Sequence, residues 1–252
     1  MPISVGAQLY SLRDCLQTPA GIEATLVRVA QAGCKILQCS GFSFDAVWLK
    51  ALCDQLGLQV KLTHTPAERI LHDTQNVIFE HKTLDCPYVG LGYWDFCCAD
   101  DVHAFLKTFA PAMQALHSAG LKLQYHNHSH EFARCGEGTL FGLLADKSDP
   151  ALLGFTLDVY WAQHGGMDVC ALIRRLKGRI DVCHYKDMAI VQKQQRFAAV
   201  GKGNLPWPAI IEAFESAGAR YAFVEQDDCY GADPVDELTD SLRYLREISP
   251  SR

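Results

Sequence analysis

The chain has 252 residues, of which 49% are hydrophobic and 21% charged; this supplies a large core and excludes an intrinsically disordered protein. The net charge of −6, without a stripe of basic residues, gives no electrostatic support for binding nucleic acid or an anionic membrane. No apolar run approaches the roughly 20 residues that span a bilayer, and the amino-terminal residues lack a leader pattern, so we expect a cytoplasmic protein.

Eight short apolar runs predict strands, and each is followed by sequence that is compatible with a helix. The runs span residues 4–9, 35–39, 58–64, 88–91, 121–127, 153–158, 180–185 and 221–225. The first two helix-period segments end at Gly33 and Gly57, a residue type that is favoured directly after a helix. Repeated strand and helix units without Pro/Ser-rich linkers predict one α/β domain over residues 1–252, closed as a single (β/α)8 TIM barrel.

Two stretches fit this alternation poorly. Residues 69–86 are only loosely helical, and residues 188–204 have a polar centre that predicts a long loop, a feature that often forms part of an active site. An open doubly wound sheet is the alternative, but the first strand is followed by YSLRD rather than a glycine-rich phosphate turn. The GKG at residues 201–203 lacks a nucleotide-binding context and predicts a turn before a helix that begins near Pro206.

The eleven cysteines include no CxxC motif, so neither a zinc knuckle nor a secreted disulfide framework is supported. Most are expected to be reduced and buried. Cys183 precedes His184, but neighbouring residues of a strand point to opposite faces, which argues against a catalytic thiol.

Potential metal ligands lie at or after the ends of the last four predicted strands. They are Glu131, Asp158, His184 and Glu225. Because the carboxyl ends of barrel strands share one rim, we expect these side chains to converge. Three carboxylates and one imidazole suit one divalent metal ion, with Mn²⁺, Co²⁺, Mg²⁺ and Zn²⁺ all compatible.

The first ligand is open, because His126, His128 and His130 alternate along the fifth strand and share a face while it stays extended. Either His126 or His128 could bind the metal in place of Glu131, which would then contact the substrate. Hydrogen-bonded rim residues would also explain these histidines. For Asp158 the alternative is a helix cap, but the following residues show no obvious helix start.

Four further residues are predicted to bind the substrate. His64 ends the third strand, Lys186 lies beside His184, Arg196 lies in the predicted long loop, and Trp161 follows Asp158. Lys186 could instead neutralise the carboxylates of the rim, and Arg196 could be a solvated charge. Trp161 offers a flat face for a sugar ring or, alternatively, belongs to the core.

Five segments in order, YHNHSHEF, LDVYWAQHGGMD, GRIDVCHYKD, VGKGNLPW and VEQDD, resemble the xylose isomerase-like TIM-barrel superfamily of sugar (phosphate) isomerases and epimerases. Its members include inosose dehydratase and endonuclease IV. The resemblance covers the whole chain and implies one divalent ion bound by Glu131, Asp158, His184 and Glu225. Relatives with the first glutamate on strand five itself would place it near residues 124–126, where this chain has no carboxylate.

The predicted function is a divalent-metal-dependent isomerase or epimerase of a small sugar or sugar phosphate, acting through a metal-bound enediolate. Glu131 and Glu225 are the expected acid and base, with His126 or His128 as alternatives. Expulsion of a hydroxyl from the same enolate keeps a dehydratase or lyase of keto-sugars or cyclitols open, and a non-catalytic sugar-binding barrel is a further alternative. We expect a sugar as partner, no nucleic acid and no membrane; homo-oligomerisation stays open.

Overall fold

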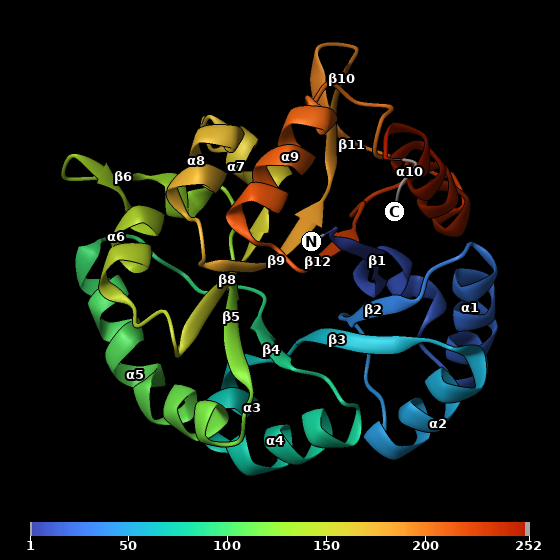
Figure 1. The fold of residues 1–252 in the computed structure, drawn as a ribbon, viewed down its shortest axis with the longest axis horizontal. Helices are drawn as coiled ribbons and strands as arrows, with labels where there is room; N and C mark the ends of the chain where they lie inside the picture. Colours follow the sequence, from blue (N-terminus) through green and yellow to red (C-terminus); the bar gives the residue numbers. More distant parts are fainter. Residues whose placement is uncertain (1, 250–252) are drawn as a thin grey trace.

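The computed structural model describes residues 2–249, which form a closed barrel of eight parallel strands inside a ring of helices (Figure 1). The barrel strands are β1 (Ser4–Gln8), β2 (Ile36–Cys39), β3 (Gln59–His64), β4 (Tyr88–Leu91), β5 (Lys122–His126), β8 (Leu153–Asp158), β9 (Ile180–Tyr185) and β12 (Tyr221–Val224). Each strand pairs with its neighbours along the chain, and β12 closes the barrel on β1. The predicted (β/α)8 barrel is confirmed, and each predicted strand overlaps an observed one.

The helices cover the outside of the barrel. They are α1 (Pro19–Gln31), α2 (Ala46–Leu56), α3 (Ala67–His72), α4 (Thr74–Thr83), α5 (Ala99–Ser118), α6 (Leu140–Lys147), α7 (Val159–His164), α8 (Val169–Arg175), α9 (Trp207–Ala217) and α10 (Pro234–Ile248), with short 3-10 helices η1 (Leu9–Cys15) and η2 (His130–Phe132). Thr18 and Asp45 cap the first two helices, and Gly57 ends α2 with a φ of 67°. None of the helices within residues 2–249 is long and apolar enough to cross a bilayer.

One prediction about an irregular segment is confirmed and one is corrected. Most of the loosely helical stretch 69–86 lies in two successive helices, α3 and α4. The predicted long loop is wrong over its first part, because β10 (Asp187–Val191) and β11 (Gln194–Ala198) form an antiparallel hairpin. Gln192 and Lys193 turn it with φ values of 51° and 66°, the left-handed geometry that tight hairpins require. The hairpin projects beyond the ring of helices in Figure 1.

The apolar core lies mainly between the strands and the surrounding helices. A second, smaller cluster is formed by strand residues Ile36, Leu62, Tyr88, Val182 and Phe223. Side chains alternate between the two faces of a strand, so His184 shares a face with Val182 but lies nearer the strand's carboxyl end. The barrel therefore carries polar side chains at the carboxyl end of its strands, and the smaller apolar cluster lies beneath them.

Thiol reactivity should follow this burial, since all eleven cysteines are free. Burial raises the pKa of Cys34 and of Cys86 to about 12, which suppresses the reactive thiolate. We expect a disulfide reagent to label exposed Cys15, Cys97 and Cys98 first, and all eleven thiols after denaturation. Mass spectrometry of labelled peptides measures this order; early labelling of buried Cys183 would contradict it.

Candidate metal site

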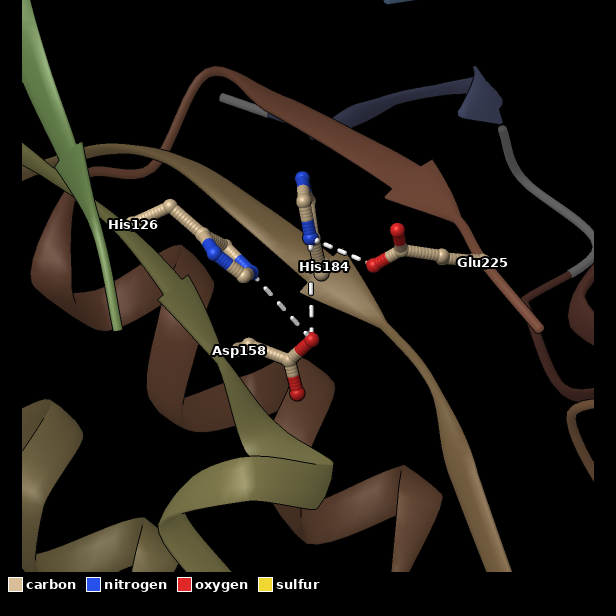
Figure 2. A group of neighbouring side chains, drawn as sticks. All are labelled: His126, Asp158, His184 and Glu225. Atoms are coloured by element: carbon tan, nitrogen blue, oxygen red, sulfur yellow. Dashed lines mark ion pairs between the residues drawn. The ribbon is translucent and has the colours of Figure 1, made fainter. Parts of the chain in front are cut away.

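Four buried side chains converge at the carboxyl end of the barrel (Figure 2). His126 ends β5, Asp158 ends β8, His184 lies on β9 and Glu225 follows β12. One potential ligand atom from each residue lies within 4.8 Å of the other three. Asp158 Oδ2 is 3.5 Å from His126 Nε2 and 3.6 Å from His184 Nδ1, while His184 Nδ1 is 2.8 Å from Glu225 Oε2. Barrel closure thus brings together residues that are distant in the sequence.

Within the described part of the chain, the atoms that face one another in this group contact each other and Lys186 as ion pairs but form no well-oriented hydrogen bond. They are His126 Nε2, Asp158 Oδ2, His184 Nδ1 and Glu225 Oε2. Most buried polar atoms in proteins have a hydrogen-bond partner, and a cluster without one needs an explanation. A single cation bound by all four atoms would satisfy them together.

The remaining nitrogens of the two histidines are held in place. His126 Nδ1 lies 3.2 Å from the Gly92 carbonyl oxygen, and His184 Nε2 lies 2.7 Å from Gln38 Oε1. If each of these nitrogens donates its proton, the opposite nitrogen presents a lone pair to the group. Metal-binding histidines are commonly oriented in this way.

Asp158 serves as a helix cap as well as a member of the group. Its Oδ1 accepts a hydrogen bond of 3.0 Å from Trp161 N, which leaves Oδ2 to face the histidines. The sequence argument against a helix start was therefore wrong, since α7 begins at the next residue. Asn127 fixes the backbone of Asp158, because its Oδ1 accepts from Asp158 N at 2.9 Å and its Nδ2 donates to Asp158 O at 3.3 Å.

Glu131 does not join the other three predicted ligands, and His126 takes its place in the group. β5 ends at His126, and η2 carries Glu131 into a buried position. There Oε1 accepts from the Tyr125 hydroxyl at 2.6 Å and Oε2 accepts from His128 N at 2.8 Å. Burial raises the pKa of this carboxyl group. Glu131 therefore stabilises the turn that follows β5.

Lys186 lies beside the group and is 1% exposed. Its Nζ is 3.4 Å from Asp158 Oδ2, 3.1 Å from Glu225 Oε2 and 2.9 Å from Asp227 Oδ1. Burial alone would lower the pKa of Lys186, but these carboxylates outweigh it and raise the pKa. These contacts fit the predicted role of Lys186 in neutralising the carboxylates, and its place in the pocket lining keeps substrate binding as a prediction.

The electrostatics of the group favour a positive charge in its centre. Burial alone would lower the pKa of His184, but Glu225 and Asp158 outweigh it and raise the pKa to about 9. Burial would also raise the pKa of Glu225, yet Lys186 and His184 hold it well below its usual range. Without another cation, a proton on His184 and the ammonium of Lys186 balance the acids. A divalent ion suits the same environment.

A pocket of about 270 Å³ opens over the group. Its lining includes Tyr10, Ser40, His64, Gly92, Tyr93, His126, His128, Lys186, Glu225 and Asp227. Burial lowers the pKa of His64 well below its usual range and that of His128 to about 3, so both imidazoles are neutral at neutral pH. His64 Nε2 and His128 Nδ1 make no hydrogen bond within residues 2–249.

Two of the predicted substrate-binding residues do not line this pocket. Trp161 packs against His128, with ring centroids 5.4 Å apart, and its ring faces Lys186 Nζ at 5.3 Å. Arg196 lies on β11, where its guanidinium stacks over the Tyr230 ring at 4.7 Å. Trp161 thus contacts His128 and Lys186 without lining the pocket. Arg196 contacts Tyr230 in the loop that follows β12.

Sequence reasoning missed three residues that shape the site, Gln38, Asn127 and Asp227. Asp227 had a signal, because it follows Glu225 by two positions in VEQDD at the carboxyl end of a strand. Asn127 had a weaker one, as the last residue of the predicted strand 121–127. Gln38 gave none, since a glutamine within a strand is equally compatible with a solvent-facing position.

The chain matches the xylose isomerase-like TIM barrel family over residues 20–248 and belongs to that family. No curated protein sequence gives a significant match. Among solved structures, a sugar phosphate isomerase/epimerase from Parabacteroides distasonis is 24% identical with a TM-score of 0.84, over 99% of this chain and 95% of that one. An L-ribulose 3-epimerase is 16% identical with a TM-score of 0.76, over 99% and 95% of the two chains. The IOLI protein with a bound zinc atom is 11% identical with a TM-score of 0.73, over 99% and 98%.

Proposed function

We propose that the protein is a divalent-metal-dependent isomerase or epimerase of a small sugar, with the ion held by His126, Asp158, His184 and Glu225. The observation that carries this proposal is the set of four buried ligand atoms, two imidazole nitrogens and two carboxylate oxygens, that lie within 4.8 Å of one another. Membership of the family, and similar folds in proteins named as isomerases or epimerases, support the same reaction class. The bound ion supplies positive charge that makes the proton beside a substrate carbonyl acidic.

The ligand set bears on the choice of metal. Two imidazoles and two carboxylates form a mixed nitrogen and oxygen set. Mg²⁺ prefers oxygen ligands, whereas Mn²⁺, Co²⁺ and Zn²⁺ accept imidazole readily. We therefore propose one of these three ions rather than Mg²⁺, which the sequence had left equally open.

For proton transfer we propose His128 and Glu225. His128 lines the pocket, and its Nδ1 makes no hydrogen bond within the described residues, so this nitrogen is available to a proton from substrate carbon. Glu225 contacts His184 and Lys186 through Oε2, so its other carboxylate oxygen is left for the substrate. The two residues reach the pocket from β5 and β12, on different sides of the barrel. Return of the proton from the opposite side inverts a stereocentre, and return to the neighbouring carbon interconverts aldose and ketose.

Incubating metal-loaded protein with ketoses, aldoses and keto-cyclitols in D₂O tests the proposal. We expect deuterium to enter at the carbon beside the carbonyl, detected by NMR, with no loss of water from the sugar. His128→Gln should reduce this exchange by about 100-fold or more, the usual contribution of a general base.

Two other products would point elsewhere. An unsaturated sugar would indicate a dehydratase or lyase. Stoichiometric metal binding without exchange on any substrate would indicate a sugar-binding barrel and would overturn the proposed catalysis.

A further inference from the structure

We infer that the sugar accepted at this site carries no phosphate group. This inference rests on the proposed function and narrows its substrate class. In TIM barrels a phosphate is often bound by the loops that follow strands seven and eight, together with the amino terminus of a nearby helix. In this chain those strands are β9 and β12, so the loops after them are where a phosphate site would be sought.

The segment after β9 carries four backbone N–H groups and the Trp207 indole N–H that all donate to the carboxylate of Asp187. Asp187 Oδ2 accepts from Gly201 N at 2.9 Å, from Gly203 N at 3.1 Å and from Trp207 Nε1 at 2.7 Å. Its Oδ1 accepts from Met188 N at 2.7 Å and from Leu205 N at 3.3 Å. The GKG turn thus has the amide arrangement that suits an anion, but the anion is Asp187 itself.

Asp187 also leaves little room for a second anion. It is fully buried, and a Cβ placed on Gly203 would lie 2.3 Å from Asp187 Oδ1. The carboxylate therefore sits in van der Waals contact with the turn. A phosphate could enter only by displacing it.

The loop after β12 and the helix that follows are acidic. Asp227 and Asp228 lie in the loop, and Asp233 caps α10, whose first turn carries Asp236 and Glu237. Asp233 Oδ1 accepts from Val235 N at 2.8 Å, which uses an amide that a phosphate would need. The positive end of this helix is therefore already compensated by acids of the chain.

The basic residues near the pocket are engaged. Lys186 is the one lysine or arginine among the described lining residues, and three carboxylates surround it. Arg13 donates to the carbonyl oxygens of Tyr10 and Asp227, at 2.9 Å and 3.0 Å. Arg196, on the hairpin, stacks over Tyr230 of the loop that follows β12. Arg13 and Arg196 do not line the pocket, and the carboxylates of Glu225 and Asp227, which do, would repel a phosphate.

The mouth of the pocket suits an uncharged sugar instead. Tyr10 and Tyr93 line it with side chains that are 37% and 55% exposed. They come from segments after β1 and β4, which β2 and β3 separate in the barrel. The Arg13 guanidinium covers one face of the Tyr10 ring at 4.4 Å, so the more exposed Tyr93 ring is the one that suits the apolar C–H faces of a sugar ring.

Two measurements test the inference. Calorimetry and histidine NMR signals of the metal-free protein should show no saturable binding of inorganic phosphate in the millimolar range. The metal-loaded protein should bind each neutral sugar of a matched panel at least about tenfold more tightly than its phosphate ester, a difference of about 1.4 kcal/mol. Tyr93→Arg adds a guanidinium at the mouth and should create phosphate binding, whereas the matched neutral variant Tyr93→Gln should not.

The two measurements separate this inference from the proposed function. Saturable binding of phosphate to the parent protein, with a shift of the His128 signals, overturns the inference, as does a phosphate ester that binds as tightly as its parent sugar. If no sugar binds and no deuterium enters any of them, the proposed function fails. The titration with inorganic phosphate still decides whether the site accepts that group.

Discussion

Replacing Lys186 by methionine is expected to destabilise the metal-free protein by about 3–5 kcal/mol. Methionine keeps most of the volume of the lysine side chain but removes the charge that contacts Asp158, Glu225 and Asp227 at 3.4, 3.1 and 2.9 Å. Removing one partner of a buried ion pair leaves its counter-charges unpaired in a medium of low dielectric constant. Urea unfolding, followed by circular dichroism in a chelating buffer, measures the free energy of unfolding.

A divalent ion should restore much of this loss, because it brings positive charge to the same carboxylates. The gain is about 2.7 kcal/mol when the free ion is at a hundred times its dissociation constant. Lys202→Met is the matched control, since Lys202 pairs with Glu237 and Asp240 but its side chain is 50% exposed. Such surface pairs contribute at most about 1 kcal/mol. Equal destabilisation by both changes, or no rescue by metal, would contradict the role assigned to Lys186.

The second large effect concerns metal binding. Asp158→Asn should weaken the affinity for the divalent ion by more than about 100-fold, because changes to outer-shell partners alone cost about 10–100-fold. Asparagine is also a good helix cap, so the bond to Trp161 N and the fold should be preserved. His184→Ala should cause a comparable loss. Metal content after dialysis and calorimetric titration give the affinities, and circular dichroism checks the fold.

Glu131→Gln is the matched control for Asp158→Asn, because it removes a carboxylate of the same neighbourhood. The carboxylate oxygens of Glu131 accept hydrogen bonds from Tyr125 and His128 and do not face the four potential metal ligands. We therefore expect Glu131→Gln to retain one ion per chain, while His126→Ala loses it. Retained metal in Asp158→Asn together with loss in Glu131→Gln would restore Glu131 as the first ligand and reject the site described above.

Much of the barrel was predictable from the sequence, because its strands are buried apolar runs and helix caps and glycines mark the ends of the helices between them. Asp158, His184 and Glu225 were predictable as a group for the same reason, since each lies at the carboxyl end of such a run. The hairpin of β10 and β11 was not, because its strands are polar and Gln192 and Lys193 are unusual residues for a tight turn. Propensity alone favours a loop there.

The sequence by itself thus determined the barrel and the rim on which acids and imidazoles gather, since both follow from periodicity and strand ends. Only the tertiary structure places His126, rather than Glu131, in the group of four potential ligands. That choice depends on where β5 ends and on the hydrogen bonds that turn Glu131 toward Tyr125. Only the tertiary structure also shows that Lys186 contacts carboxylates from two other segments, because barrel closure rather than local sequence brings those segments together.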